Sequence, residues 1–104
     1  MCIRDRPGYA VYAATKAAIE TMTNILAKEL RGKGITVNAV APGPTATALF
    51  LNGKPAEAVA RLAKAAPLER LGTPEHIASV VAFLAGPDVA WVNAPTLRAN
   101  GGIV

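Results

Sequence analysis

The feature that most constrains the fold is a helical pattern that runs into a short apolar segment and then into prolines. From Tyr9 to about Arg31, apolar residues recur every three or four positions, which is typical of an amphipathic helix. Gly32 and Gly34 supply conformations that end helices, and Ile35–Ala41 has the composition of a strand. Pro42-Gly43-Pro44 stops that strand, because proline lacks an amide hydrogen. The apolar stripe expected on the helix comprises Ala14, Ala18, Ile19, Met22, Ile25, Leu26 and Leu30.

Two further helices and one strand are predicted after the prolines. Pro55 suits the first position of a helix that Pro67 stops. Thr73 is a suitable N-cap for a second helix, which ends at Gly86. A short strand, Thr96–Ala99, closes the pattern.

Strands that alternate with helices predict an α/β arrangement with a parallel sheet. Two strands are too few for such a sheet, because its interior strands need neighbours on both sides. We therefore expect the C-terminal portion of a doubly wound Rossmann-type domain, with its N-terminal half missing. Its order is a long helix, a parallel strand, two helices and a final short strand. Residues 1–6 carry three of the 18 charged residues and follow no periodicity of the remaining chain, so we expect them to be a non-native leader.

Composition excludes several classes of partner. The 11 Lys and Arg residues exceed the 7 Asp and Glu residues by four, but they are scattered and do not alternate with aromatics, which argues against a nucleic-acid partner. The longest apolar stretch, residues 77–86, falls short of the roughly 20 residues of a membrane span. One cysteine and one histidine leave no zinc shell or disulfide framework. We expect a cytoplasmic chain with no metal, membrane or nucleic-acid partner.

Tyr12 and Lys16 are the first candidate catalytic residues. Their side chains are four residues apart and therefore share one face of the predicted helix. A free phenol has a pKa near 10 and is a poor acid at neutral pH. A neighbouring ammonium and a helix N-terminus both favour the phenolate, which makes the pair a tuned proton donor and acceptor. The alternative is structural, with a packed tyrosine ring beside a solvated lysine.

Several spaced motifs resemble the short-chain dehydrogenase/reductase family. The segment Tyr12 to Ala18 resembles its Tyr-x-x-x-Lys signature, and Ile35 to Gly43 resembles its strand followed by a Pro-Gly turn. The segments Arg70 to Glu75 and Asn100 to Gly102 resemble later landmarks, so the resemblance covers residues 7–104. It implies that these residues are the C-terminal part of a single Rossmann-type oxidoreductase domain.

The resemblance implies that Tyr12 and Lys16 are catalytic. Tyr12 would exchange a proton with the substrate oxygen while a hydride moves between the nicotinamide and the adjacent carbon, so that a carbonyl and a secondary alcohol are interconverted. Lys16 would also bind the nicotinamide ribose. The cofactor is NAD(P); the residues present do not decide between its two forms, and we expect NADP(H).

The family pattern implies four further cofactor-binding residues. Pro42 and Gly43 would line the nicotinamide pocket, the backbone of Thr45 would meet the carboxamide, and the hydroxyl of Thr47 would approach the pyrophosphate. Alternatively, Pro42-Gly43 only breaks the loop and Thr47 only caps a helical turn. The substrate would be a small carbonyl or alcohol, and residues 46–68 resemble the mobile segment that covers it.

Neither a glycine-rich phosphate loop nor the family's upstream serine is found in the sequence, so we expect the chain alone to be inactive. The full-length parent is expected to be a homodimer or homotetramer. The alternative is a catalytically silent chain, an interaction module that packs its alanine-rich helix on a partner. Among single residues, Asn38 is expected to bind neighbouring backbone, Trp91 to pack on the core, and His76 to lie at the surface near a helix start.

Overall fold

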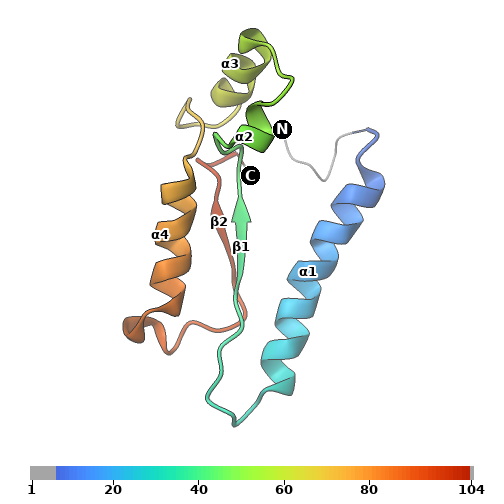
Figure 1. Ribbon diagram of the computed structural model, residues 1–104. Coiled ribbons are helices and arrows are strands. Elements are labelled where there is room, and N and C mark those ends of the chain that lie inside the picture. Colours follow the sequence, from blue (N-terminus) through green and yellow to red (C-terminus); the bar gives the residue numbers. More distant parts are fainter. Residues whose placement is uncertain (1–6, 104) are drawn as a thin grey trace.

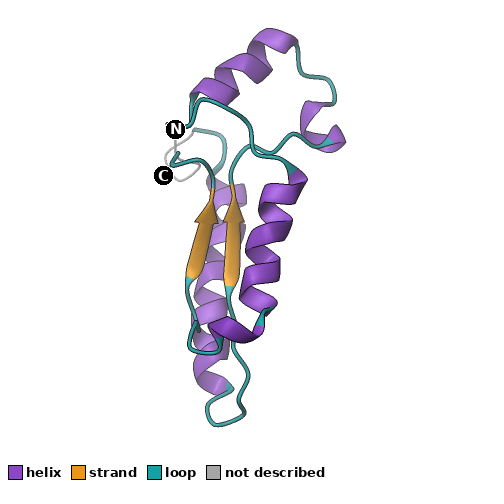
Figure 2. Ribbon diagram, turned by 90° about the vertical axis from the view of Figure 1, so that its left-hand side faces the viewer, coloured by secondary structure: helices purple, strands orange, loops and turns teal. Residues whose placement is uncertain are grey.

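The computed structural model describes residues 7–103, and the expected leader at residues 1–6 lies outside them. Two parallel strands form a sheet that α1 covers on one face and α4 on the other (Figures 1 and 2). In chain order the elements are α1 (Ala10–Glu29), β1 (Ala39–Pro42), α2 (Ala48–Leu51), α3 (Ala56–Lys64), α4 (Pro74–Ala85), the 3-10 turn η2 (Pro87–Val89) and β2 (Thr96–Ala99). The expected partial Rossmann-type α/β fold is confirmed.

β1 begins and ends later than the predicted strand at residues 35–41. Before Ala39, the chain runs beside a loop instead of a strand: the Val37 amide donates to Oδ1 of Asn93 at 2.9 Å, and the Val37 carbonyl accepts from Ala94 at 2.9 Å. Strand pairing starts only where β2 becomes available, at the pair Ala39 and Thr96.

Pro42 belongs to β1 although proline cannot donate a hydrogen bond. On the side that faces β2, the Ala39 amide donates to the carbonyl of Pro95, just before β2, and the Gly43 amide to that of Ala99, each at 3.0 Å. Because the amides of a strand alternate in direction, the nitrogen of Pro42 faces away from β2. The missing hydrogen therefore costs this pairing nothing.

The predicted helices are confirmed with small shifts, and one helix was missed. α4 begins at Pro74 after the N-cap Thr73, as predicted, and ends before Gly86. α3 begins at Ala56, so Pro55 is its N-cap and not its first residue. The short helix α2 was not predicted, because its four residues are too few to show a helical period.

The apolar stripe predicted on α1 is largely exposed. Ile19, Met22 and Ile25 remain 48%, 59% and 51% exposed, whereas the buried residues of the helix are Thr23 and Ala27. The sheet explains this difference, because its two strands are too narrow to cover the whole inner side of a helix of 20 residues.

Two of the three single-residue expectations are confirmed. The side-chain amide of Asn38 donates to the Val92 carbonyl at 3.2 Å, while its Oδ1 is buried and has no hydrogen-bond partner. His76 is exposed in the first turn of α4. The prediction for Trp91 is wrong: this side chain is 99% exposed, because η2 directs Val89 into the core instead.

No helix within residues 7–103 is long and apolar enough to cross a membrane. The chain also exposes much of its surface. Its accessible surface is 7456 Å², compared with about 5500 Å² for a compact protein of its mass. Buried side chains in the described part are limited to Thr23, Ala27, Ala66 and Val89.

With so small a core, the 104-residue chain is expected to unfold without a sharp transition when heated in dilute solution. Near-ultraviolet circular dichroism and calorimetry measure this directly. A cooperative heat-absorption peak would contradict the expectation.

Candidate functional site

Tyr12 and Lys16 lie together in the first two turns of α1. The Lys16 ammonium is 5.3 Å from the centroid of the Tyr12 ring, a distance at which a cation is attracted to an aromatic face. Tyr12 is 46% exposed and Lys16 is exposed, so both polar groups can be reached from solvent. The pair that the spacing predicted is therefore formed, and its phenol is accessible.

α1 places this pair at the carboxyl end of the sheet. The helix runs antiparallel to β1, so its first turn and the end of β1 lie at the same end of the fold (Figure 1). Loops at the carboxyl ends of parallel strands are where open α/β sheets bind ligands. Of the other four predicted residues, Pro42 ends β1, and Gly43, Thr45 and Thr47 lie in the loop that follows it, at this same end.

Gly43 is held against the end of β2. A Cβ atom at Gly43 would lie 2.7 Å from the Asn100 Cα and 3.0 Å from the Asn100 carbonyl oxygen. Only a residue without a side chain permits this approach, so packing alone accounts for glycine here. Pro42 is exposed at the end of β1.

The two threonines already make bonds within the loop. The Thr45 hydroxyl donates to the Gly43 carbonyl at 2.9 Å, and the Thr47 hydroxyl accepts from the Phe50 amide at 3.1 Å as the N-cap of α2. A parallel bridge pairs Thr45 with Gly72. Its hydrogen bonds use the Pro44 carbonyl and the Ala46 amide, so the Thr45 amide faces away from the bridge.

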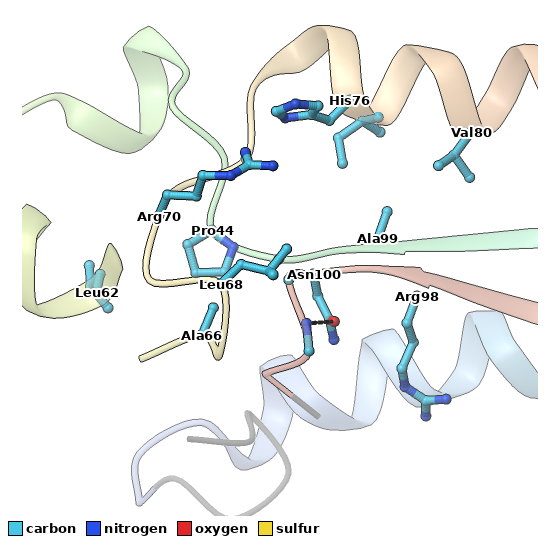
Figure 3. Close-up of a pocket in the computed structure, with 15 residues that line it drawn as sticks. Pro44, Leu62, Ala66, Leu68, Arg70, His76, Val80, Arg98, Ala99 and Asn100 are labelled. Carbon is cyan, nitrogen blue, oxygen red and sulfur yellow. Dashed lines mark hydrogen bonds between the residues drawn. The ribbon is translucent and has the colours of Figure 1, made fainter. Parts of the chain in front are cut away.

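A cavity of about 480 Å³ lies beside this loop and is lined mostly by residues outside the predicted set (Figure 3). Leu62, Ala66 and Leu68 provide an apolar wall, and Arg70 and His76 line it near the start of α4. Gly43 lines it too, but Tyr12 and Lys16 do not. No motif in the sequence points to this cavity, because its lining comes from segments far apart in the chain.

The start of α4 carries a hydrogen-bonded cap that includes His76. The Thr73 amide donates to Nδ1 of His76 at 2.9 Å. The hydrogen bond from the Thr73 side chain is the largest cause that holds the pKa of Glu75 below its ordinary value of 4.5; a backbone hydrogen bond and the charge of His76 act in the same direction, and desolvation opposes them. The three-residue spacing of Thr73 and His76 was the available signal, although capping boxes usually have Glu or Gln at this position.

The described residues fit the nicotinamide end of a dinucleotide. They offer an accessible phenol at Tyr12, an exposed ammonium at Lys16 and a backbone amide at Thr45 that faces away from its bridge. The cation suits ribose hydroxyls, and the amide suits a carboxamide oxygen. For the adenosine and pyrophosphate, the sequence contains no glycine-rich loop between a strand and a helix.

Comparison with known proteins identifies the relatives of this chain. The family model described as enoyl-(acyl carrier protein) reductase matches residues 2–104. The chain belongs to the short-chain dehydrogenase/reductase family. The resemblance inferred from the motifs is confirmed.

Individual members of the family are close in sequence. This short-chain dehydrogenase/reductase chain is 55% identical over 98 residues to a short-chain type dehydrogenase/reductase of Picea abies, and 50% identical over 99 residues to an NADPH-dependent aldehyde reductase-like chloroplastic protein of Arabidopsis thaliana. These alignments cover 94% and 95% of this chain but 36% and 37% of the relatives. The chain therefore spans little more than a third of their length.

A solved structure shows the same relation in three dimensions. The angucycline C-6 ketoreductase LanV, solved with bound NADP, superposes with a TM-score of 0.85 at 33% sequence identity. The match covers 96% of this chain and 38% of LanV. The short-chain dehydrogenase/reductase fold is thus present in part.

Replacing Thr73 with alanine is expected to raise the pKa of Glu75 toward 4.5, because the largest stabiliser of the carboxylate is removed. A pKa that is lower in the folded chain than in the unfolded chain stabilises the fold above pH 4.5, and this contribution is lost as the pH falls through the folded value. Carbon NMR of the Glu75 carboxyl measures the shift. Thr73→Ser keeps the hydroxyl and serves as the control; equal titrations of Glu75 in both variants would contradict the assignment.

Gly43→Ala is expected to destabilise the pairing of β1 with β2 by about 1–3 kcal/mol, since the added methyl meets the backbone of Asn100. Gly72→Ala is the matched control, because its added methyl comes no closer than 3.5 Å to Thr45 Oγ1. Both variants are made in a hybrid protein, in which this chain replaces the 98 aligned residues of the Picea abies relative. The denaturant concentration at the midpoint of unfolding is measured for each variant of the hybrid, and equal midpoints would refute the packing role of Gly43.

Proposed function

We propose that this chain is the C-terminal part of an NAD(P)-dependent oxidoreductase that interconverts a carbonyl and a secondary alcohol, with Tyr12 as the proton donor and acceptor. The observation that carries the proposal is the accessible Tyr12 phenol with the Lys16 ammonium beside it, at the carboxyl end of the sheet. A relative named as an NADPH-dependent aldehyde reductase-like protein, at 50% identity, and LanV with its bound NADP support it.

The chemistry divides between the cofactor and the side chains. When bound, the nicotinamide supplies hydride transfer. In the reductive direction, the Tyr12 hydroxyl donates its proton to the substrate oxygen, and in the oxidative direction the phenolate accepts it. The Lys16 ammonium lies over the Tyr12 ring and offers hydrogen-bond donors to the ribose.

Pro42, Gly43, Thr45 and Thr47 are proposed to bind the cofactor on the opposite side of the site from α1. The Thr45 amide is the strongest of these four candidates, because it faces away from the bridge with Gly72. The Thr47 hydroxyl accepts from Phe50 and keeps its own hydrogen as a donor for a pyrophosphate oxygen.

NADP(H) is the proposed form of the cofactor, because the Arabidopsis relative is named NADPH-dependent and LanV was solved with NADP. The proposed substrate is a small carbonyl compound or alcohol. A ketone, the substrate class in the name of the ketoreductase LanV, yields a secondary alcohol, whereas the aldehyde in the Arabidopsis name yields a primary one. A homodimer or homotetramer is proposed for the full-length parent. The cytoplasmic location stays a prediction, since that same relative is named chloroplastic.

A second candidate is the catalytically silent interaction module. The exposed apolar side chains of α1 favour it, because Ile19, Met22 and Ile25 offer a partner an uncovered surface. The small residues Ala14, Ala17 and Ala18 are exposed too and permit close approach of a second helix. Activity of the hybrid distinguishes the two candidates, because a silent module would leave it inactive.

Tyr12→Phe in the hybrid is expected to lower kcat for NADPH-dependent carbonyl reduction by about 100-fold or more, since general acid catalysis contributes on that order. Lys16→Met is expected to lower activity and weaken cofactor binding. Lys28→Met, at the other end of α1, is the control for loss of a charge. Activity in Tyr12→Phe equal to that of the unmodified hybrid would refute the role of Tyr12.

The 104-residue chain alone is expected to bind NADPH weakly or not at all, because the phosphate loop that would hold most of the dinucleotide is not in its sequence. Titration calorimetry with NADPH tests this expectation. Micromolar affinity would show that the C-terminal part suffices for binding.

A further inference from the structure

Tyr9 contacts the ring of Tyr12 just before α1 begins. The ring centroids are 5.8 Å apart and the ring planes meet at 83°, which is a perpendicular arrangement. Aromatic pairs favour this geometry at centroid distances of about 4.5–7 Å. Tyr9 belongs to none of the motifs described above and takes no part in the proposed mechanism.

The backbone of Tyr9 is well placed to support such a contact. Its carbonyl accepts the Ala13 amide at 2.7 Å, the hydrogen bond that opens α1. Gly8 precedes it with a φ of +84°, a conformation that glycine adopts without strain and that turns the chain into the helix. Tyr9 is half-buried, whereas Tyr12 is 46% exposed.

The Tyr12 ring therefore has two neighbours from its own chain segment, Tyr9 three residues before it and Lys16 four residues after it. A half-exposed ring without such contacts exchanges among rotamers on a timescale of picoseconds to nanoseconds. Proton transfer needs the hydroxyl held within a fraction of an ångström of its working position. The Lys16 ammonium is carried by a flexible side chain and restrains the Tyr12 ring little. The neighbour that can restrain the ring is therefore Tyr9.

We propose that Tyr9 is a positioning residue that holds the Tyr12 ring in its reactive orientation through this perpendicular ring contact. The inference rests on the proposed function of Tyr12. The contact needs an aromatic ring and not a phenol hydroxyl, so phenylalanine can replace Tyr9 and leucine cannot.

The composition of the chain offers a direct measurement of the contact. Tyr9 and Tyr12 are its only tyrosines, so Tyr9→Phe and Tyr9→Leu each leave Tyr12 as the sole tyrosine of this chain. In the hybrid with ring-labelled tyrosine, where the Tyr12→Phe variant identifies the Tyr12 signals, the Tyr12 ring signals of Tyr9→Phe are expected to stay displaced from those of free tyrosine. In Tyr9→Leu they are expected to move to the free positions. Identical Tyr12 signals in the two variants, displaced or free, would overturn the proposal.

Kinetics in the hybrid test the consequence for the reaction. Tyr9→Leu is expected to lower kcat by about tenfold with the KM for NADPH unchanged, and Tyr9→Phe to restore kcat. Unchanged kcat in Tyr9→Leu, or an equal loss in both variants, would overturn the positioning role. The parallel Tyr12→Phe hybrid separates the two proposals: full activity there refutes the function of Tyr12, whereas its loss without an effect of Tyr9→Leu refutes only the function of Tyr9.

Discussion

The parallel pairing of β1 with β2 is the constraint on which the rest of the structure depends. It joins segments more than fifty residues apart and fixes their register from Ala39 and Thr96 to Pro42 and Ala99. The register brings Gly43 against Asn100 and places the following loop beside the chain that leaves β2. α1 packs on one face of this sheet and α4 on the other (Figure 1). The first turn of α1 lies at the same end of the sheet as the loop after β1.

The proposed site is built at this end from short-range and long-range effects. The contacts of Tyr12 with Tyr9 and Lys16 are local, because all three residues lie within two helical turns. The loop after β1 depends on distant partners, since Gly43 is fitted to Asn100 and Thr45 is bridged to Gly72. One half of the site is thus formed by helix geometry, and the other by the pairing of strands and loops.

This division explains what the sequence could predict. The spacing of residues was enough to predict that Tyr12 and Lys16 lie side by side and that Thr73 is an N-cap, because helix geometry is set by neighbours in the chain. The start of β1 was predicted four residues early, because apolar composition cannot show where β2 begins. The burial of Trp91 was predicted wrongly, because the geometry of the turn η2, which the sequence does not show, decides that Val89 enters the core. The motifs were sufficient for the family and the partial fold.

Pro42 has a consequence for the free edge of the sheet. In β1 the amides that point away from β2 alternate with those that point toward it, so only Val40 and Pro42 face outward. Since proline has no amide hydrogen, Val40 is the single outward donor of the strand. A strand that adds to this edge can accept one hydrogen bond from β1, which restricts its register. The proline therefore limits how many hydrogen bonds any neighbouring strand can accept from this edge of β1.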